Sequence, residues 1–410
     1  MRRTLLPAVV AASLVGLVTL SWSVGRSAPD PTKGGLPGAR PEIDASRYPT
    51  LQAAFDALPA EGGLIRLPAG TFEIDESLVI SQQDVRIEGA GTATHIHNTN
   101  AEGQPALFLR PDKGFKDKDG KERIWRVMLS NFRITGNEKS GVGIHAKWVQ
   151  EIFLQGVTVS EHGGHGIFLD YCYEDPRISD CLITYNKGAG VHLLGCHDII
   201  VSANQFEENQ DALHCFEGFN LCMTGNNLDD HLGHGVVIED TYGSVVSGNM
   251  IEECKGTAII LDRDCYGNTI SANEIAHNGG GIDLRDAHGC AVSANTITIC
   301  ASHAVRIGPD SGRITVTGNN LSNSYVGDGK IRRRENDMLA AGMTIEGASD
   351  VTVSGNLFSD VKPKALELVG EGAQRVLFAN NVLTSVESDH GKLKKSLVTN
   401  NLESEAASDK

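Results

Sequence analysis

The stretch from Ser202 to Asn226, SANQFEENQDALHCFEGFNLCMTGN, opens with Ser-Ala-Asn and closes with Thr-Gly-Asn. The same tripeptide pattern returns at 247–249, 271–273, 293–295 and 317–319, so its asparagines lie 22, 23, 24, 22 and 24 residues apart. A repeat of this length cannot bury a core alone and must stack on its neighbours, which predicts a solenoid. The asparagines are predicted to hold corners together, because their amides can bond the backbone of the next repeat and Asn tolerates the left-handed conformation.

A short strand is the second landmark of each repeat. The segments HGIFLD (165–170), AGVHLL (189–194), HGVVIE (234–239) and GGIDLR (280–285) share a small second residue and aliphatic third and fifth residues. This alternation predicts a strand with one buried face, and two further short strands fit in each repeat. The sequence therefore predicts an all-β fold, a single-stranded right-handed parallel β-helix of about eleven coils.

Residues 50–74, TLQAAFDALPAEGGLIRLPAGTFEI, and the motif IEGAG at 87–91 resemble the N-terminal part of the pectate-lyase-like superfamily. There, a short amphipathic helix leads through a Gly-Gly turn into a first strand. The resemblance covers about residues 44–402. It implies a capping helix near 50–58, export, and a carbohydrate-active function in general.

The N-terminus has the features of a secretory signal. Arg2 and Arg3 precede an apolar run, and Ser23-Val24-Gly25 offers small residues for cleavage, so residues 1–25 are predicted to be a signal peptide. An uncleaved membrane anchor is the alternative, because the apolar run approaches the length of a membrane span. Residues 26–43 are predicted to be a flexible linker, 44–402 the β-helix and 403–410 a disordered tail. The protein is expected to be secreted or to lie in the periplasm or cell envelope.

Composition limits the partners. The 36 Lys and Arg against 52 Asp and Glu give a net charge of −16, which argues against nucleic acid as a partner. Beyond the N-terminal segment no membrane contact is predicted, and the sequence leaves the oligomeric state open. Nine cysteines are present. Cys172 and Cys196 are one repeat apart, and a stacking distance of about 4.8 Å would permit a disulfide between them.

Ionisable side chains collect on the outward positions of the first strand. The residues expected to act in catalysis are Asp211, His234, His214 and Arg306, and those expected to bind substrate on this face are His192, Phe216 and Arg285. A carboxylate beside an imidazole suits general acid–base chemistry, and outward aromatic rings could stack on sugars. Glu239, Asp262 and Asp283 lie on successive coils and are candidate Ca²⁺ ligands. The alternative is the ordinary polar surface of a solenoid.

Two insertions interrupt the repeat, at 111–123 and at 324–338. Both are basic, and the second adds Arg332, Arg333 and Arg334 to the substrate-binding candidates. Long loops on a rigid scaffold are often functional, so both are predicted to overhang the outer face of the first strand. The alternative is two solvated loops.

Three short motifs also resemble the polygalacturonase family, which carries N-x-D, D-D, G-H-G and R-I-K on its coils. They are Asn209-Gln210-Asp211, Gly233-His234-Gly235 and Arg306-Ile307. No D-D coil lies between Asp211 and His234, and Gly308 stands where that family has Lys. A second Gly-His-Gly occurs at 164–166.

The predicted function is action on a polysaccharide, an acidic one containing uronic acids, by β-elimination or epimerisation. His234 or His214 would be the base, oriented by Asp211, and Arg285, Arg306 or a bound Ca²⁺ would stabilise the negative charge that develops. Two alternatives stay open: a polygalacturonase-like glycoside hydrolase, and a non-catalytic glycan-binding or adhesion protein.

Overall fold

The computed structural model describes residues 36–322 and 340–404. Residues from Arg40 onward form one compact unit, and the preceding residues form a separate unit, of which only 36–39 are described. The predicted signal peptide, most of the predicted linker, the Arg332–Arg334 segment and the end of the tail thus lie outside the described residues. Among those described, no helix has the length and apolar character needed to cross a membrane.

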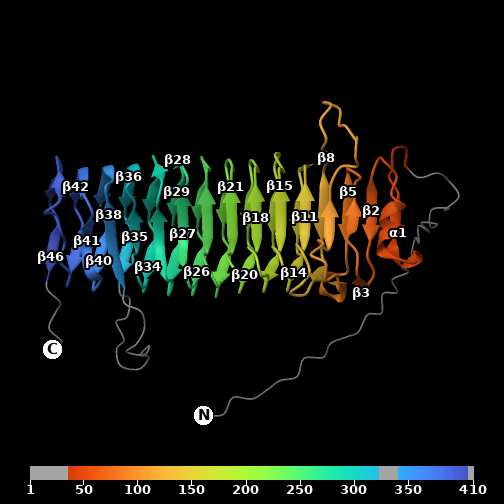
Figure 1. Cartoon of the computed structure of the whole chain (residues 1–410), viewed down its shortest axis with the longest axis horizontal. Coiled ribbons are helices and arrows are strands. Elements are labelled where there is room, and N and C mark those ends of the chain that lie inside the picture. Colours follow the sequence, from red (N-terminus) through yellow and green to blue (C-terminus); the bar gives the residue numbers. More distant parts are fainter. Residues whose placement is uncertain (1–35, 323–339, 405–410) are drawn as a thin grey trace, which may run out of the picture. The chain divides into compact units, whose positions relative to one another are not determined.

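The unit from Arg40 onward is a parallel β-helix, as predicted, in which three long sheets run side by side (Figure 1). We call them sheets 1, 2 and 3 in the order in which the chain visits them within a coil. The β-helix has about 15 turns, where the sequence predicted about eleven coils. The count was too low because the coils before residue 142 lack the regular first-strand pattern and the last described coil has no strand in sheet 1.

Sheet 1 has 12 strands, which correspond to the predicted first strands. They are β4 (Leu78–Ile80), β7 (Leu107–Leu109), β11 (Ile144–Lys147), β15 (Ile167–Asp170), β18 (Val191–Leu194), β21 (Leu213–Phe216), β24 (Val236–Glu239), β27 (Thr257–Asp262), β31 (Gly280–Leu284), β35 (Val305–Ile307), β38 (Ala341–Glu346) and β41 (Lys362–Val369).

Sheet 2 has 18 strands and begins inside the predicted linker, at Glu42. They are β1 (Glu42–Asp44), β2 (Gly63–Arg66), β5 (Val85–Glu88), β9 (Val127–Ser130), β13 (Phe153–Gln155), β16 (Arg177–Ser179), β19 (Ile200–Ser202), β22 (Cys222–Thr224), β25 (Val245–Ser247), β28 (Cys265–Tyr266), β29 (Thr269–Ser271), β32 (Ala287–His288), β33 (Ala291–Ser293), β36 (Gly312–Thr317), β39 (Ser349–Ser354), β42 (Ala373–Ala379), β44 (Leu393–Lys394) and β45 (Leu397–Thr399).

Sheet 3 completes each coil, and a two-stranded pair supports the 111–123 loop. The strands of sheet 3 are β3 (Gly70–Ile74), β6 (Thr94–Asn98), β10 (Arg133–Thr135), β14 (Thr158–Ser160), β17 (Leu182–Thr184), β20 (Gln205–Glu207), β23 (Asn227–Asp229), β26 (Met250–Glu252), β30 (Glu274–Ala276), β34 (Thr296–Thr298), β37 (Asn320–Ser322), β40 (Leu357–Ser359), β43 (Val382–Thr384) and β46 (Leu402–Ser404). The pair is β8 (Ile124–Trp125) with β12 (Val149–Gln150).

The predicted capping helix is α1 (Leu51–Asp56), and two short 3₁₀ turns, η1 (Ala45–Arg47) and η2 (Gly91–Ala93), complete the elements. The Thr50 side chain caps α1 by accepting a hydrogen bond from the backbone N–H of Ala53. Leu51, Ala54 and Phe55 face the core, and the Gln52 amide bonds both backbone groups of Val79 in β4. The helix therefore covers the open edge of sheet 1 at the N-terminal end.

The core is a single apolar column along the axis, because inward side chains stack on the same positions of neighbouring coils. The third and fifth positions of the first strands, such as Val236 and Ile238, are fully buried, as the alternation predicted. The stacked strands are hydrogen-bonded from coil to coil, so the scaffold that carries the outward side chains is rigid.

The asparagines form a ladder at the corner between sheets 2 and 3, which confirms their structural role. The Oδ1 atom of Asn249 accepts hydrogen bonds from the backbone N–H and Nδ2 of Asn226, at 3.1 and 2.9 Å, and its own Nδ2 donates to the carbonyl of Met223. The ladder continues beyond the predicted range to Asn356, Asn381 and Asn401. One detail was wrong, because the left-handed residue is the one before each ladder asparagine, an Ala or Gly such as Ala203 and Gly248 in most coils and Asn380 and Asn400 in the last two.

The disulfide considered between Cys172 and Cys196 is not formed. Both residues are buried free thiols, and all nine cysteines of the chain are free. The Cys172 Sγ lies 3.5 Å from the carbonyl of Ala146, and the Cys196 Sγ lies 3.4 Å from that of Leu169. Each thiol therefore points to the backbone of the preceding coil.

Candidate functional site

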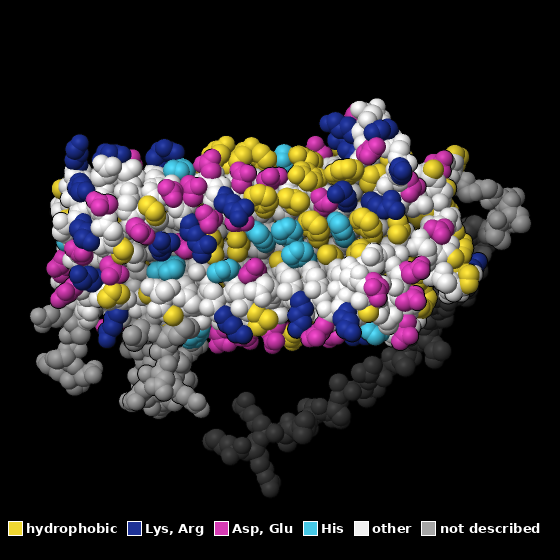
Figure 2. Space-filling view, viewed as in Figure 1, with side chains coloured by type: hydrophobic (Ala, Val, Ile, Leu, Met, Phe, Trp, Pro, Cys, Tyr) yellow, Lys and Arg dark blue, Asp and Glu magenta, His cyan; other side chains and the backbone are white. Residues whose placement is uncertain are grey.

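On the outer face of sheet 1 the predicted ionisable side chains line up from coil to coil, in the register that the repeat predicted. His192 is paired with His214 on the next coil, and Asp283 is paired with Arg306. Histidine side chains gather in the middle of this face (Figure 2). Between these two pairs of residues lie Val237 and Ile260, so the structure divides the predicted cluster into two regions.

The first region is the histidine group, which we define as His145, His165, His192 and His214. Its rings stack with two phenylalanines along the axis. The Phe108 and His145 centroids are 4.8 Å apart, those of His145 and Phe168 4.6 Å, and those of Phe168 and His192 5.0 Å. The row ends at His214, whose ring meets that of His192 edge-on at 5.0 Å.

Burial keeps the inner histidines neutral. It lowers the pKa of His192 to about 3, helped by the neighbouring His165 and His214. Burial is also the main cause of the lowered pKa of His165, whose ring stacks on His192 at 4.7 Å. Neutral imidazoles at neutral pH make this part of the face a polar surface without positive charge.

His214 and Glu239 form the site's closest acid–base pair. The Nε2 atom of His214 lies 2.8 Å from Oε2 of Glu239, and the two side chains are 28% and 15% exposed. Arg263 contacts the other oxygen of Glu239 at 3.1 Å, and its guanidinium lies 5.6 Å from the ring centroid of Phe216. A carboxylate at Nε2 favours the tautomer that carries its proton there, so Nδ1 of His214 retains a lone pair for accepting a proton.

Asp211 and His234 lie on adjacent coils, as predicted, but their side chains do not bond each other. The Asp211 carboxylate accepts a hydrogen bond from the backbone N–H of His234 at 2.5 Å. The Nδ1 of His234 accepts one from the backbone N–H of Thr257 at 2.9 Å. Both side chains thus hold the corner of the next coil, and Asp211 does not orient the His234 imidazole.

The triplets that resemble polygalacturonases also serve corners. His165, in the second Gly-His-Gly, accepts a hydrogen bond from the backbone N–H of Ala189, which is the same bond that His234 makes. Asn209 is fully buried and bonds the backbone of Asn186 and the carbonyl of Ile183. The triplets therefore have a common structural explanation in this fold.

The second region is a network of ion pairs towards the C-terminal end. Asp283 is buried and receives Arg285 at 2.8 Å and Arg306 at 3.1 Å, and Arg306 also binds Glu346 at 2.9 Å. Arg285 reaches Asp262 at 3.6 Å. Four coil-to-coil steps separate His214 from Arg306, so these two do not share one sugar ring.

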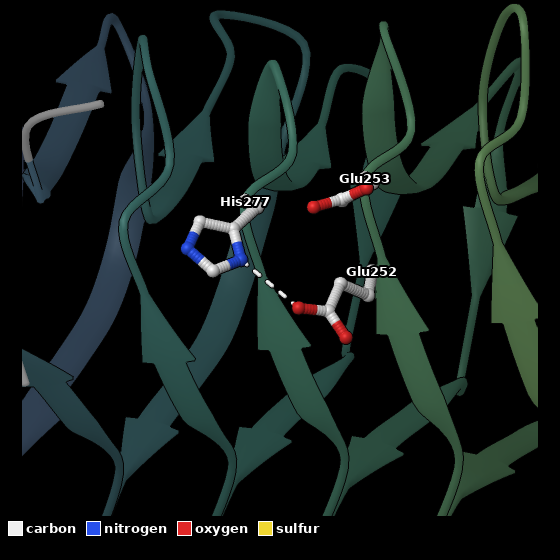
Figure 3. Close-up of side chains that lie close together, drawn as sticks. All are labelled: Glu252, Glu253 and His277. Carbon is white, nitrogen blue, oxygen red and sulfur yellow. Dashed lines mark hydrogen bonds and ion pairs between the residues drawn. The ribbon is translucent and has the colours of Figure 1, made fainter. Parts of the chain in front are cut away.

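The three predicted Ca²⁺ ligands do not converge. Glu239 contacts His214 and Arg263, Asp283 contacts two arginines, and Asp262 bonds the backbone N–H of Arg263. In the described part of the chain, other groups of acidic and histidine side chains bring their potential ligand atoms within 4.8 Å of one another. One consists of Glu252, Glu253 and His277, where Nδ1 of His277 bonds Glu252 at 3.0 Å (Figure 3).

Among the described residues, two further groups have metal-ligand geometry, and neither includes a residue of the predicted set. They are Asp264, Asp286 and His288, and Asp229, Asp230 and Glu253. Acidic surface groups of this kind are common without a metal, and neither contacts the histidine group.

The structure adds Arg263 and His165 to the candidates. Arg263 lies in the corner, one residue after the outward-facing Asp262, and so falls outside the first-strand positions from which the candidates were predicted. His165 opens the segment HGIFLD (165–170) and was not among the predicted site residues. The predicted residues Arg332, Arg333 and Arg334 lie outside the described residues.

The 111–123 loop projects beside sheet 1 rather than over its outer face. It stands at the corner after β11 and β15 (Figure 1). There Lys121 and Arg123 line a cavity together with Trp148 and Tyr171. The prediction of an overhanging loop was wrong in direction, because the strand pair β8–β12 anchors its end at this corner.

Comparison with known proteins supports the fold. A family model described as "Right handed beta helix region" matches residues 82–221, 140–265 and 211–383. No curated protein sequence matches the chain.

Solved structures with a similar fold share little sequence with this chain. The A-module of mannuronan C-5 epimerase AlgE6 from Azotobacter vinelandii is 14% identical, with a TM-score of 0.51, and the match covers 88% of this chain and 99% of that module. Tailspike protein 3 of bacteriophage CBA120 is 10% identical, with a TM-score of 0.53 over 82% of this chain and 56% of the tailspike. ORF18 of Geobacillus virus E2 is 16% identical, with a TM-score of 0.46 over 68% of this chain and 57% of that protein. The chain therefore spans a little over half of the two viral proteins, and at these identities the likeness shows the fold alone.

Proposed function

Because this chain belongs to the right-handed β-helix family, we propose that it acts on an acidic polysaccharide lying along the outer face of sheet 1. The observation that carries the proposal is the pair His214–Glu239 beside Arg263 and Phe216. It combines a proton acceptor, a cation and an aromatic ring, the three groups that a uronic-acid residue would need. The A-module of the mannuronan C-5 epimerase, an enzyme named for a uronic-acid polymer, has a similar fold.

The proposed reaction begins with removal of the C5 proton of a uronic acid. Nδ1 of His214 accepts this proton, and the electron pair moves into the adjacent carboxylate to form an enediolate. Arg263 stabilises the charge that develops there. In epimerisation a proton returns to C5 from the opposite face. In β-elimination the electrons instead form the C4–C5 double bond, the C4–O bond breaks, and the leaving oxygen takes up a proton.

The other predicted residues support this centre in the proposal. His192 and His165 line the approach to His214, and the negative charge of Asp211 acts on His165. His234 fixes the corner that begins the next strand. Arg285 and Arg306 would bind carboxylates of sugars several residues away along the polymer, and Arg332, Arg333 and Arg334 would add positive charge. We place the reaction outside the cytoplasm, because residues 1–25 have the features of a secretory signal.

The test is an assay of the full chain on alginate and pectin, with Ca²⁺ or with a chelator. We expect either an unsaturated product, which absorbs in the ultraviolet, or exchange of the C5 proton with solvent deuterium. His214→Gln and Glu239→Gln should each lower turnover by about a hundredfold or more, the usual contribution of general acid–base catalysis. A matched control is His97→Gln, since His97 is another partly exposed histidine close to a glutamate, Glu73 at 4.0 Å.

The outcomes separate the alternatives. Reducing ends without unsaturation would indicate a glycoside hydrolase, and binding without any product would indicate a glycan-binding protein. Full activity of His214→Gln would remove His214 from the mechanism. Loss of activity with the chelator, restored by Ca²⁺, would indicate that the reaction requires this ion.

A further inference from the structure

A cavity of about 430 Å³ opens at the corner after sheet 1, away from the histidine group. Its walls combine aromatic rings with hydrogen-bonding and charged groups. They are Lys121, Glu122, Arg123, Trp148, Gln150, Tyr171, Tyr173 and Glu174. Apolar walls with a few polar groups are typical of small-ligand sites, and this combination also matches a sugar ring, which has an apolar C–H face and a rim of hydroxyls.

The loop that closes one side of the cavity is built around a buried carboxylate. Asp117 accepts hydrogen bonds from the backbone N–H groups of Asp119 and Lys121, both at 2.9 Å, and from the side chains of Arg123 and Trp125. The Arg123 guanidinium also lies 4.6 Å from the ring centroid of Trp125. The loop is therefore a preformed wall, although its sequence reads as a run of solvated charges.

The opposite side is also held in place. Oε1 of Gln150 accepts hydrogen bonds from the backbone N–H groups of Tyr173 and Glu174, both at 2.8 Å. The Tyr171 ring occupies the space beside Gly195, where a Cβ atom would lie only 2.5 Å from it. The glycine lets the ring lie against the next coil, and the Tyr171 hydroxyl reaches Glu217 on the coil after that at 3.3 Å.

From this cavity a partly exposed row of aromatic side chains runs along the axis. We call it the aromatic row: Tyr171, Tyr173, His197, Phe219, Tyr242 and Tyr266. Successive ring centroids are 6.1, 4.3, 4.1, 3.9 and 4.7 Å apart. Tyr173 and Tyr266 are 39% and 48% exposed, and hydrophobic side chains line the upper edge of the face (Figure 2). From Tyr173 onward the row repeats once per coil, so it suits a linear polymer that lies parallel to the axis.

The charge beside the row selects the polymer. Glu217 and Asp240 occupy the corner positions on one side, and Asp198 lies on the other. Three cations near the cavity and the row are paired with carboxylates, Arg123 with Asp117 and Asp119, Lys147 with Asp170 and Arg263 with Glu239, and the whole chain carries a net charge of −16. An anionic polysaccharide would be repelled here, whereas a neutral one would not.

We propose that the cavity and the aromatic row form a binding site for a neutral polysaccharide, with one sugar residue in the cavity. The site differs in place and in ligand charge from the proposed reaction centre at His214, and it does not depend on that activity.

Intrinsic fluorescence tests the proposal directly. The chain has three tryptophans, Trp22, Trp125 and Trp148, of which Trp148 lines the cavity and Trp125 supports its loop. The full chain is titrated with cellohexaose, xylohexaose, laminarihexaose and maltohexaose, and with hexagalacturonate as the charged comparison. We expect at least one neutral hexasaccharide to change the fluorescence, and hexagalacturonate to bind more weakly at low salt.

Variants then locate the bound sugar. Trp148→Ala and Tyr173→Ala should each weaken binding of the neutral hexasaccharide about tenfold, measured by calorimetry. Tyr266→Ala should weaken binding of the hexasaccharide but not of the matching disaccharide. The disaccharide reaches only the cavity and the end of the row beside it, at Tyr173. Tyr185→Ala is the control, since Tyr185 is 44% exposed and lies outside the row.

Several results would overturn the proposal. They are no binding of any neutral hexasaccharide, unchanged affinity in both Trp148→Ala and Tyr173→Ala with circular dichroism intact, or equal binding of hexagalacturonate. His214→Gln should retain neutral-sugar binding, so failure of the proposed reaction and failure of this site are distinguishable.

Discussion

At the scale of single residues, a side chain on the outer face often has a backbone task that its column position does not reveal. His165, Asp211 and His234 each lie two residues before a strand of sheet 1, and each accepts a hydrogen bond from the backbone of the next coil. Register predicts which Cα atoms are neighbours, whereas the direction of a side chain depends on which donors lack a partner. The pairing of His192 with His214 was therefore predictable, but the Asp211–His234 contact expected from the sequence was not formed.

Asp211→Asn separates the two roles of Asp211. Asparagine keeps an oxygen that can accept the His234 N–H but loses the charge, so we expect an unchanged fold and lower turnover on the acidic polymer. Circular dichroism and the activity assay together measure this. His234→Ala, in contrast, leaves the Thr257 N–H unpaired and should cost about 1–3 kcal/mol of stability. Wild-type turnover in Asp211→Asn would leave Asp211 with its corner role alone.

The cysteines should differ sharply in reactivity. Eight are buried, and burial raises the pKa of Cys215 to about 12, whereas Cys222 is exposed. We expect a thiol reagent to label one cysteine in the native protein, none in Cys222→Ser, and all nine after denaturation. Labelling of several native thiols would contradict the buried positions.

Buried histidines should make the protein less stable in acid. His162 is fully buried, and burial lowers its pKa from 6.5 to about 4. Between these values the unfolded chain binds a proton that the folded chain does not, so stability is present above pH 6.5 and is lost as the pH falls towards 4. At pH 5 the loss from this residue is about 2 kcal/mol.

The measurement compares guanidinium unfolding of the wild type and His162→Gln at pH 7 and pH 5. The variant should lose less stability over this range, although His192 and His231, whose pKa values burial also lowers, retain part of the effect. Identical pH dependence in both proteins would refute the assignment to His162.

At the scale of elements, the asparagine ladder shows what a repeat can and cannot predict. The pattern at 202–204 predicted the corner and its amide bonds. The 324–338 insertion stretches the step from Asn319 to Asn356 to 37 residues, and the ladder continues across it. The pattern assigned the left-handed conformation to the ladder asparagine, whereas the residue before it adopts this conformation and frees the amide to point inward.

Removing a ladder asparagine should lower the free energy of unfolding more in the middle of the stack of coils than at its C-terminal end. Asn249→Ala leaves the backbone N–H and one amide hydrogen of Asn226 and one bond to the carbonyl of Met223 unmade in a buried corner, so we expect a loss of about 3 kcal/mol or more. Asn401→Ala, in a partly exposed corner that water reaches, should cost about 1 kcal/mol. Chemical denaturation measures both, and equal losses would argue against a cooperative ladder.

At the scale of the whole molecule, the β-helix behaves as a stack in which each coil contacts its neighbours. The repeat predicted this organisation and its inward residues, because both follow from a period that the sequence prints. It did not predict that the outward charges separate into a histidine group and an arginine network, since that separation depends on Val237 and Ile260 and on how long side chains reach between coils.

Stacking implies that one whole coil can be removed. Thr269 pairs with Ala291, so excision of residues 269–290 joins Asn268 to Ala291 and restores the register in sheet 2. We expect a folded protein with a lower thermal midpoint, because one set of interfaces is lost. Excision of 269–279 removes half a coil and should abolish the fold, measured by circular dichroism and resistance to trypsin. Equal stability of the two deletions would contradict the stack.

The buried free thiols have a consequence for how the chain would mature. With no disulfide to lock it, an exported chain would meet an oxidising compartment with nine reactive sulfurs until its coils closed. Folding would then compete with wrong cross-links, and the closing of each coil would be the step that protects its sulfur. Oxidants present during refolding should therefore trap scrambled species, whereas the same oxidants added afterwards should find almost nothing to attack.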